Sequence, residues 1–114
     1  MANDWIYEKA NALVKKYFTR DPLELTQILN IHLEEINNTT VLLGMYQIIQ
    51  RNRFIFLSSN LYPNIRKVVL AHEIGHDQLH RRYAKQNAFH EVSIFRELNH
   101  YEIEANIFAS HLLI

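Results

Sequence analysis

Residues 68–76 read Val-Val-Leu-Ala-His-Glu-Ile-Gly-His, in which His72, Glu73 and His76 have the types and the spacing to bind and use a metal ion. Residues four apart on an α-helix lie one above the other, so the two imidazoles can share one ion. Glu73 follows the first histidine directly, which would place its carboxylate beside the ion as a base for water. The pattern therefore predicts a zinc hydrolase with His72 and His76 as ligands and Glu73 as the general base.

The residues around this motif are largely apolar: Ile65, Val68, Val69, Leu70, Ala71 and Ile74. They indicate a helix packed inside a domain, where the ring nitrogens of both histidines need partners. One interpretation is a metal site, and the other is a pair of core histidines that bond to neighbours, with Glu73 capping or solvated. A catalytic zinc needs a third protein ligand and an open fourth position. A carboxylate elsewhere in the chain would therefore favour the metal.

Such carboxylates occur near the C-terminus, where residues 101–109 read Tyr-Glu-Ile-Glu-Ala-Asn-Ile-Phe-Ala. With HEIGH at 72–76 and EIEANIFASHLL at 102–113, the chain resembles the ImmA/IrrE-type zinc peptidases of bacteria and mobile elements. These enzymes are gluzincin-like, and their pattern is roughly HELGH, a variable loop, then ExEANxFAxxLL. The resemblance implies that Glu104 is the third ligand, with Glu102 as the alternative. It covers the second half of the chain closely and the first half in outline.

Two residues after the motif need separate interpretations. Asp77 puts a charge where such helices usually carry an uncharged residue, and we favour a solvated position over a role in orienting a ligand imidazole. His80 is about 12 Å along the helix axis from His72, too far to share the ion comfortably, and is expected at the surface or beside the ligands. The other histidines are expected to be satisfied or solvated: His32, His90, His100 and His111.

Composition favours one domain over residues 1–114. The chain has 114 residues, 48% of them hydrophobic, with only two prolines and two glycines, which is enough for one core but not two. It has no cysteine, so disulfides and thiolate metal sites are excluded. Without a signal sequence or an apolar run of membrane-spanning length, we expect a cytoplasmic protein that does not contact the membrane. Twelve basic and twelve acidic residues give zero net charge, which argues against direct nucleic-acid binding.

The rest of the chain must position the motif. Apolar residues at helical spacing predict a helix over 4–18, and Asp21 followed by Pro22 predicts the start of a second helix that runs to about residue 29. Residues 31–36 look extended, 37–40 read as a turn, and the runs 41–49 and 54–57 are typical of strands. We expect 54–58 to be a sheet edge where a peptide could add, and 81–92 to be a mobile connection.

The predicted fold is therefore α+β: a small zincin-like domain with two N-terminal helices, a small antiparallel sheet, the HExxH helix and a C-terminal ligand helix. The predicted function is that of a zinc-dependent endopeptidase in which Glu73 takes a proton from water and passes it to the leaving amine. An oxyanion partner is also expected. Its candidates, among which the sequence does not choose, are Tyr46, Tyr83, His100 and Tyr101.

The resemblance further implies a protein substrate, a helix-turn-helix transcriptional repressor of a phage or mobile element. The alternative is a non-catalytic, metal-containing binding module that sequesters a repressor without cutting it. Glu73 favours the peptidase, because a pure binder has no chemical need for it. A structural zinc site is the least favoured interpretation, since such sites are usually closed by a fourth ligand and rich in cysteine.

Overall fold

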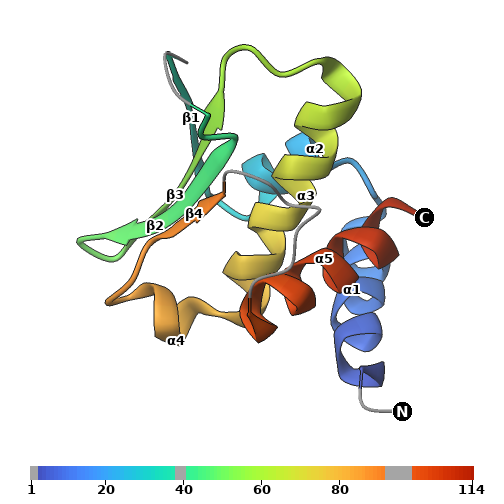
Figure 1. Ribbon diagram of the computed structural model, residues 1–114. Helices are drawn as coiled ribbons and strands as arrows, with labels where there is room; N and C mark the ends of the chain where they lie inside the picture. Colours follow the sequence, from blue (N-terminus) through green and yellow to red (C-terminus); the bar gives the residue numbers. More distant parts are fainter. Residues whose placement is uncertain (1–2, 38–40, 92–98) are drawn as a thin grey trace.

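The computed structural model describes residues 3–37, 41–91 and 99–114 as a four-stranded sheet with its helices on one side (Figure 1). The elements, in chain order, are α1 (Asp4–Tyr17), α2 (Pro22–Ile28), β1 (His32–Ile36), β2 (Gly44–Ile49), β3 (Asn52–Ser58), α3 (Pro63–Leu79), α4 (Arg81–Ala84), β4 (Phe89–Glu91) and α5 (His100–Leu113). Helix α3 packs against β2 and β3, and α5 packs against α3 and α1. The α+β prediction is confirmed. Among the described residues, no helix is long and apolar enough to cross a membrane.

The two N-terminal helices form where the apolar spacing and the capping residue predict them. Helix α1 buries Ile6, Ala10 and Leu13 on one face. Helix α2 begins at Pro22, and the side chain of Asp21 accepts a hydrogen bond from the backbone N–H of Leu23 at 3.1 Å. This cap satisfies one of the unpaired donors that every helix start exposes. The first two predicted elements therefore follow from local sequence alone.

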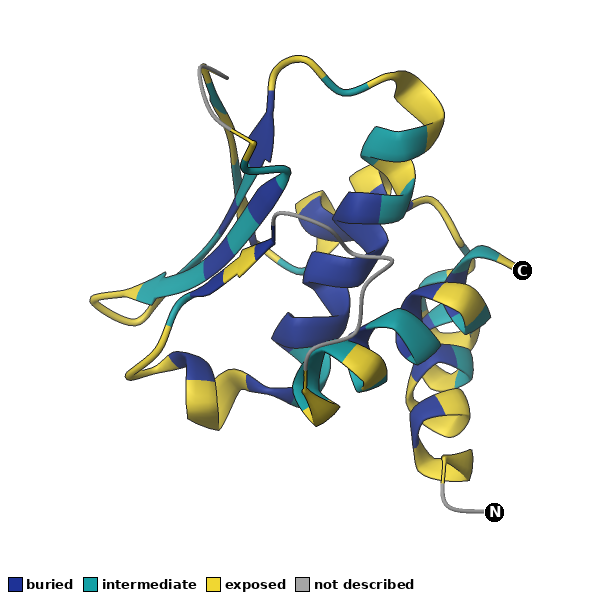
Figure 2. Cartoon of the chain, in the orientation of Figure 1, coloured by how far each residue is buried: buried dark blue, intermediate teal, exposed yellow. Residues whose placement is uncertain are grey.

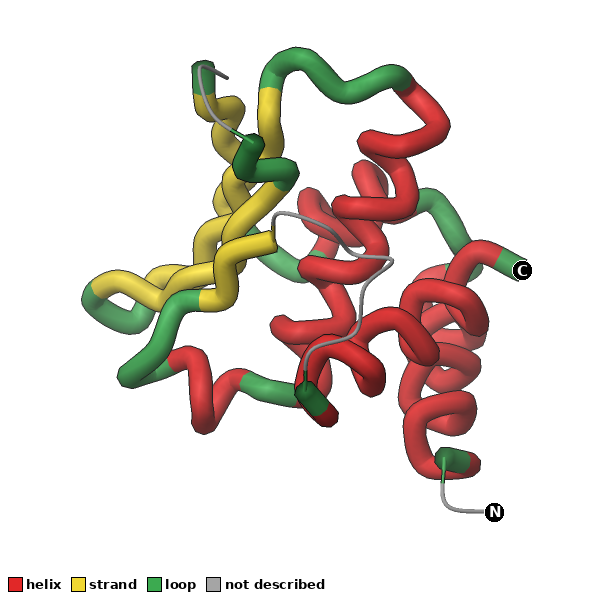
Figure 3. The backbone as a smooth tube through the Cα atoms, viewed as in Figure 1, coloured by secondary structure: helices red, strands yellow, loops and turns green. Residues whose placement is uncertain are grey.

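The sheet has the strand order β1-β3-β2-β4 and is mixed rather than antiparallel. Figure 3 shows its strands gathered beside the helices. Strands β2 and β3 form an antiparallel hairpin across Gln50 and Arg51, whose φ angles of 50° and 70° suit a tight hairpin turn. Strand β1 lies on the other side of β3 and runs parallel to it. The prediction of an antiparallel sheet is wrong for this pair, because strand periodicity says nothing about which neighbour a strand chooses.

The predicted sheet edge is also corrected, and part of the predicted connection has regular secondary structure. Strand β3, which covers residues 54–58, lies inside the sheet between β1 and β2, so the edges of the described sheet are β1 and β4. Residues 81–84 form α4 and 89–91 form β4, within the stretch expected to be mobile. Strand β4 escaped prediction because three residues are too few to show an alternating pattern. Residue 92, the last of the predicted connection, lies outside the described residues, as do residues 38–40 of the predicted turn.

Helix α3 carries the HExxH motif through the centre of the molecule and is largely buried (Figure 2). Two glycines allow its neighbours to approach it closely. A Cβ atom on Gly75 would lie 3.1 Å from the carbonyl oxygen of Ala105 on α5, and one on Gly44 of β2 would lie 2.8 Å from Oε2 of Glu73. Both distances are shorter than ordinary van der Waals contact. The motif is therefore enclosed by β2 on one side and by α5 on the other.

Candidate metal centre

The two histidines of the motif and one glutamate of α5 converge at one point. Oε1 of Glu102 lies 2.9 Å from Nε2 of His72 and 2.9 Å from Nε2 of His76. The two rings lie one helical turn apart and are fully buried, while the side chain of Glu102 is 17% exposed. Two imidazole nitrogens and a carboxylate oxygen in this arrangement are the donor types that divalent zinc prefers.

The carboxylate of α5 that lies against the histidine pair is that of Glu102, the alternative ligand, and not that of Glu104. Oε1 of Glu104 instead lies 2.8 Å from Nε2 of His80. Residues two apart on an α-helix differ by about 200° in direction, so the two glutamates cannot both face His72 and His76. Asn106, four residues after Glu102 and thus on the same face of α5, also reaches His72. That spacing of four was the signal in the sequence that could have identified Glu102.

The second nitrogen of each ring has a partner that fixes the ring's orientation. Nδ1 of His72 lies 2.7 Å from Oδ1 of Asn106, and Nδ1 of His76 lies 3.0 Å from Nδ1 of His80. His80 is itself buried and continues to Glu104. An Nδ1–H that donates to such a partner leaves the Nε2 lone pair for a metal. The row from Glu104 through His80 to His76 therefore orients one ring, and Asn106 orients the other.

A fourth donor, Glu91 of β4, was not anticipated from the sequence. Its Oε1 lies 3.4 Å from Nε2 of His72 and 3.5 Å from Nε2 of His76, and its side chain is only 3% exposed. Donor atoms of Glu91, Glu102 and the two histidines all lie within 4.8 Å of one another. Burial tends to raise the pKa of Glu91, but hydrogen bonding to His72 and then to His76 outweighs it and holds the pKa well below its usual range.

Glu73 is fully buried, and neither of its carboxylate oxygens has a hydrogen-bond partner among the described residues. Burial, followed by the negative charge of Glu91, raises the pKa of Glu73 well above its usual value. Leaving a buried polar group without a partner is costly, and such groups cluster where a ligand or a reaction will satisfy them. An orphaned carboxyl beside two imidazoles and two further carboxylates fits a site that takes a cation and a water molecule.

The protonation of His72 indicates how the site balances its charge. Burial lowers the pKa of this imidazole, but hydrogen bonds to Glu102 and then to Glu91 outweigh burial and raise it to about 9. At neutral pH the metal-free chain therefore keeps a positive charge between two carboxylates. A divalent cation would take over that role, since imidazole binds metals only in its neutral form.

Asp77 is not solvated, and this prediction is wrong. Its side chain is fully buried, and it accepts hydrogen bonds from the Tyr46 hydroxyl at 2.6 Å and from Nη1 of Arg53 at 2.9 Å. Arg53 also donates to the backbone carbonyl of Leu29. Burial and then the charge of Asp77 raise the pKa of Tyr46 above its usual value. Asp77 therefore joins α3 to the sheet, and the Tyr46 hydroxyl is committed to it rather than to an oxyanion.

The three other oxyanion candidates gather beside His80. The ring of Tyr101 lies 5.0 Å from that of His80, 4.4 Å from that of Tyr83 and 4.0 Å from that of His100, measured between centroids. All three rings therefore line the side of the site where α4 and α5 meet.

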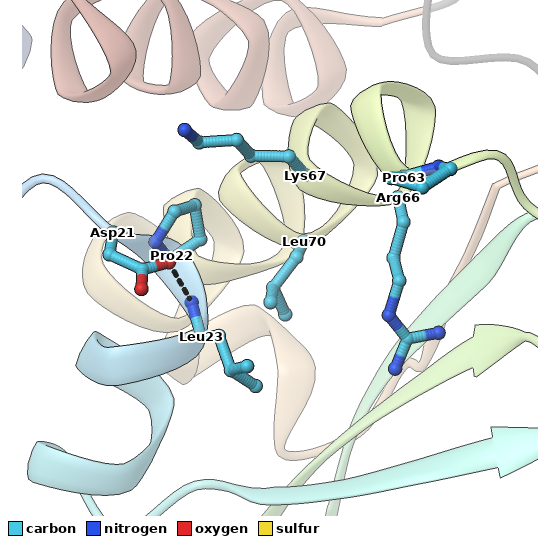
Figure 4. Close-up of a pocket in the computed structure, with 7 residues that line it drawn as sticks. All are labelled: Asp21, Pro22, Leu23, Pro63, Arg66, Lys67 and Leu70. Carbon is cyan, nitrogen blue, oxygen red and sulfur yellow. Dashed lines mark hydrogen bonds between the residues drawn. The ribbon is translucent and has the colours of Figure 1, made fainter.

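A separate pocket of about 280 Å³ lies at the opposite end of α3, near the start of α2 (Figure 4). Its lining residues are Asp21, Pro22, Leu23, Pro63, Arg66, Lys67 and Leu70. None of the four candidate metal donors belongs to this lining, and the chemistry of the site is not located there.

The chain belongs to the M78 peptidase family: residues 26–114 match the family model described as the IrrE N-terminal-like domain. The resemblance to ImmA/IrrE-type peptidases is thereby confirmed. The chain is also similar to "uncharacterized immunity region protein 2" of Bacillus phage phi105, with 40% identity over 102 residues. That alignment covers 90% of this chain and 63% of the relative, so the chain spans just under two thirds of the relative's length. The matched family region contains Glu73 and all four donors.

Proposed function

We propose that the chain is a zinc-dependent endopeptidase in which His72, His76 and Glu102 hold the metal and Glu73 is the general base. The observation that carries this proposal is the convergence of the three donors beside a buried glutamate without a partner. A structural metal site has no use for such a glutamate. A hydrolase needs it, because the nucleophilic water must lose a proton. Membership of a peptidase family supports the same reading.

Bound zinc would supply a Lewis acid that polarises the scissile carbonyl and makes a neighbouring water more acidic. The chain supplies the proton transfer. Glu73 would take the proton of the attacking water and then donate it to the leaving amine. The buried surroundings of Glu73 suit this double role, because burial raises the pKa of its carboxyl and so favours its taking up a proton. Asn106 and His80 would keep the two imidazoles aimed at the metal throughout.

For the substrate, we infer a helix-turn-helix repressor of a phage or mobile element, cut in the cytoplasm without contact between this chain and nucleic acid. Two observations support this inference. The phage relative is named for an immunity region, which fits a role related to a repressor. The chain itself has zero net charge and offers no excess of basic residues to bind phosphates.

A second function, a metal-containing module that binds a repressor without cutting it, is favoured by one observation. Glu91 is a buried fourth donor, and four protein ligands are typical of closed, structural zinc sites. In such a module Glu73 would be dispensable. The two functions therefore differ in what the loss of the Glu73 carboxylate does.

The test is Glu73→Gln, with Glu8→Gln on the exposed face of α1 as the matched control. Each variant is co-expressed with the repressor encoded nearest to its gene. Cleavage is followed on a gel, binding by pull-down, and zinc by elemental analysis. We expect normal zinc content and normal binding, with cleavage reduced at least about a hundredfold, because an amide cannot accept the proton. If wild type and variant both bind the repressor with zinc present and neither cuts it, the binding module replaces the enzyme.

A further inference from the structure

The carboxyl group of Glu91 lies where a hydrolase would need its water. On one side, Oε1 of Glu91 is 3.4 and 3.5 Å from the ring nitrogens of His72 and His76. On the other side, Gly44, the residue opposite Glu91 in the β2–β4 pairing, lies against the carboxyl of Glu73, since a Cβ atom there would be 2.8 Å from Oε2 of Glu73. The fourth position of a catalytic zinc lies between the metal and the general base. Glu91 therefore fills the space between the ligands and Glu73.

Strand β4, which carries Glu91, is the edge strand beside β2. It pairs antiparallel with β2, placing Glu91 opposite Gly44, and the backbone N–H of Leu43 donates to the carbonyl of Glu91 at 2.7 Å. The ring of Phe89, two residues earlier, stacks on that of His76 with centroids 3.7 Å apart. The three residues of β4 thus cover the ring of one metal ligand, the fourth coordination position of the metal and the edge of β2.

An extended peptide has two ways to reach the metal along this sheet. It could add outside β4, but it would then lie about one strand spacing, roughly 4.8 Å, farther from the histidines. Alternatively, it could replace β4 on β2 and form the same kind of backbone hydrogen bonds. The second arrangement brings a carbonyl of the peptide to the position that the Glu91 carboxyl now occupies. The backbone bonds would be exchanged one for one, so β4 is held chiefly by Glu91 and by the packing of Phe89.

We propose that Glu91 is a fourth protein ligand of the metal and that β4 occupies the substrate's place on β2, so that the resting site is closed until a protein partner displaces this strand. The proposal rests on the proposed function, from which it takes the bound metal and the side from which the water attacks. It reconciles a buried fourth donor, typical of a closed site, with a buried general base, typical of an open one.

The first test follows coordination with Co²⁺ in place of zinc, using Glu91→Ala, Glu91→Gln and the exposed neighbour His90→Ala as control. We expect the visible absorption of wild type and of His90→Ala to stay constant between about pH 6 and 9, because all four ligands are protein groups. Glu91→Ala should show a pH-dependent spectrum, because solvent enters the fourth position and ionises in this range. Its affinity for zinc, and that of Glu91→Gln, should fall at least about tenfold.

The second test follows β4 itself by hydrogen exchange. Zinc should slow the exchange of the amides of Phe89–Glu91 at least about tenfold in wild type, because the metal ties β4 to α3 and α5. In Glu91→Ala, zinc should still protect α3 and α5 but leave β4 unchanged. Unaltered spectra, zinc affinity and β4 protection in both Glu91 variants would overturn the proposal while leaving the peptidase intact. Failure of wild type to bind Co²⁺ or zinc would instead overturn the proposed function and, with it, the role of Glu91.

Discussion

Replacing Glu102 by glutamine should cost the protein most of its metal, whereas the same change at Glu104 should cost little. Glu102 lies 2.9 Å from both ligand nitrogens, and Glu104 contacts only His80. An amide oxygen is a weak, neutral ligand in the place of a carboxylate, so Glu102→Gln removes both charge and donor strength at the metal. In Glu104→Gln the amide oxygen can still accept a hydrogen bond from His80, so the ring of His76 stays in place.

The expected size of the difference follows from the energy of a whole site. The free energy of zinc binding at a protein site is about 10–16 kcal/mol. Each of four ligands therefore contributes roughly 2.5–4 kcal/mol, which is about two to three powers of ten in affinity. Glu102→Gln should therefore raise the Kd for zinc at least about a hundredfold. Glu104→Gln acts through two histidines and should raise it less than about tenfold.

Thermal unfolding at one fixed concentration of free zinc makes this difference visible. At a free zinc concentration about a hundred times the wild-type Kd, zinc stabilises wild type by about 2.7 kcal/mol, but stabilises a variant with a hundredfold higher Kd by only about 0.4 kcal/mol. In a domain of this size the gap corresponds to a difference in Tm on the order of 10 °C. The metal-free variants, measured in parallel with a chelator, are the control. Equal zinc shifts in both variants, or a larger loss in Glu104→Gln, would refute the placement of the third ligand on Glu102.

Two further predictions concern packing and pH. Gly44→Ala should lower the free energy of unfolding by about 1–3 kcal/mol in urea titrations, because the added Cβ would lie 2.8 Å from Glu73 Oε2 and 2.9 Å from Val69 Cγ1; a loss below about 0.5 kcal/mol would contradict this contact. The metal-free protein should lose stability as the pH rises from 6.5 to 9. The folded protein holds the proton on His72 more tightly than the unfolded chain does, so this proton stabilises the fold below pH 6.5. That contribution is lost as the pH rises to the pKa of His72 in the folded protein, which is about 9. Glu73, whose pKa is also raised, acts in the same direction, whereas the lowered pKa of Glu91 affects stability only at acidic pH. Zinc should abolish most of the loss that His72 causes, and equal losses with and without zinc in urea titrations would contradict this assignment.

The parts of the fold that the sequence predicted are those that local spacing determines. The apolar face of α1, the Asp21 cap of α2 and the histidines one turn apart on α3 all depend on contacts within a few residues. The pairing of β1 with β3 depends instead on where the chain returns after the β2–β3 hairpin. Strand periodicity predicts the strands but does not contain that information, so the sheet was expected to be antiparallel when it is mixed.

Asp77 shows the same limit for a single side chain. A charged residue next to a histidine of the motif is more often solvated than buried, because burying an unpaired carboxylate is costly. Here two partners from the sheet, Tyr46 and Arg53, remove that cost, and both are more than twenty residues away in the sequence. The pairing could not be read from α3 alone, since neither partner stands in a pattern that points to this helix.

The division between local and distant contacts also separates the residues that bind the metal from the residue that closes the site. His72, Glu73 and His76 are fixed by the turn of one helix, and the spacing of four between Glu102 and Asn106 fixes the face that α5 turns toward them. Glu91 reaches the same point only because β4 pairs with β2, through three residues of the sheet edge. A site whose binding donors come from packed helices and whose closing donor comes from a short edge strand can release that last donor without losing the others. A protein partner that competes for β2 could therefore open the site while the metal remains bound.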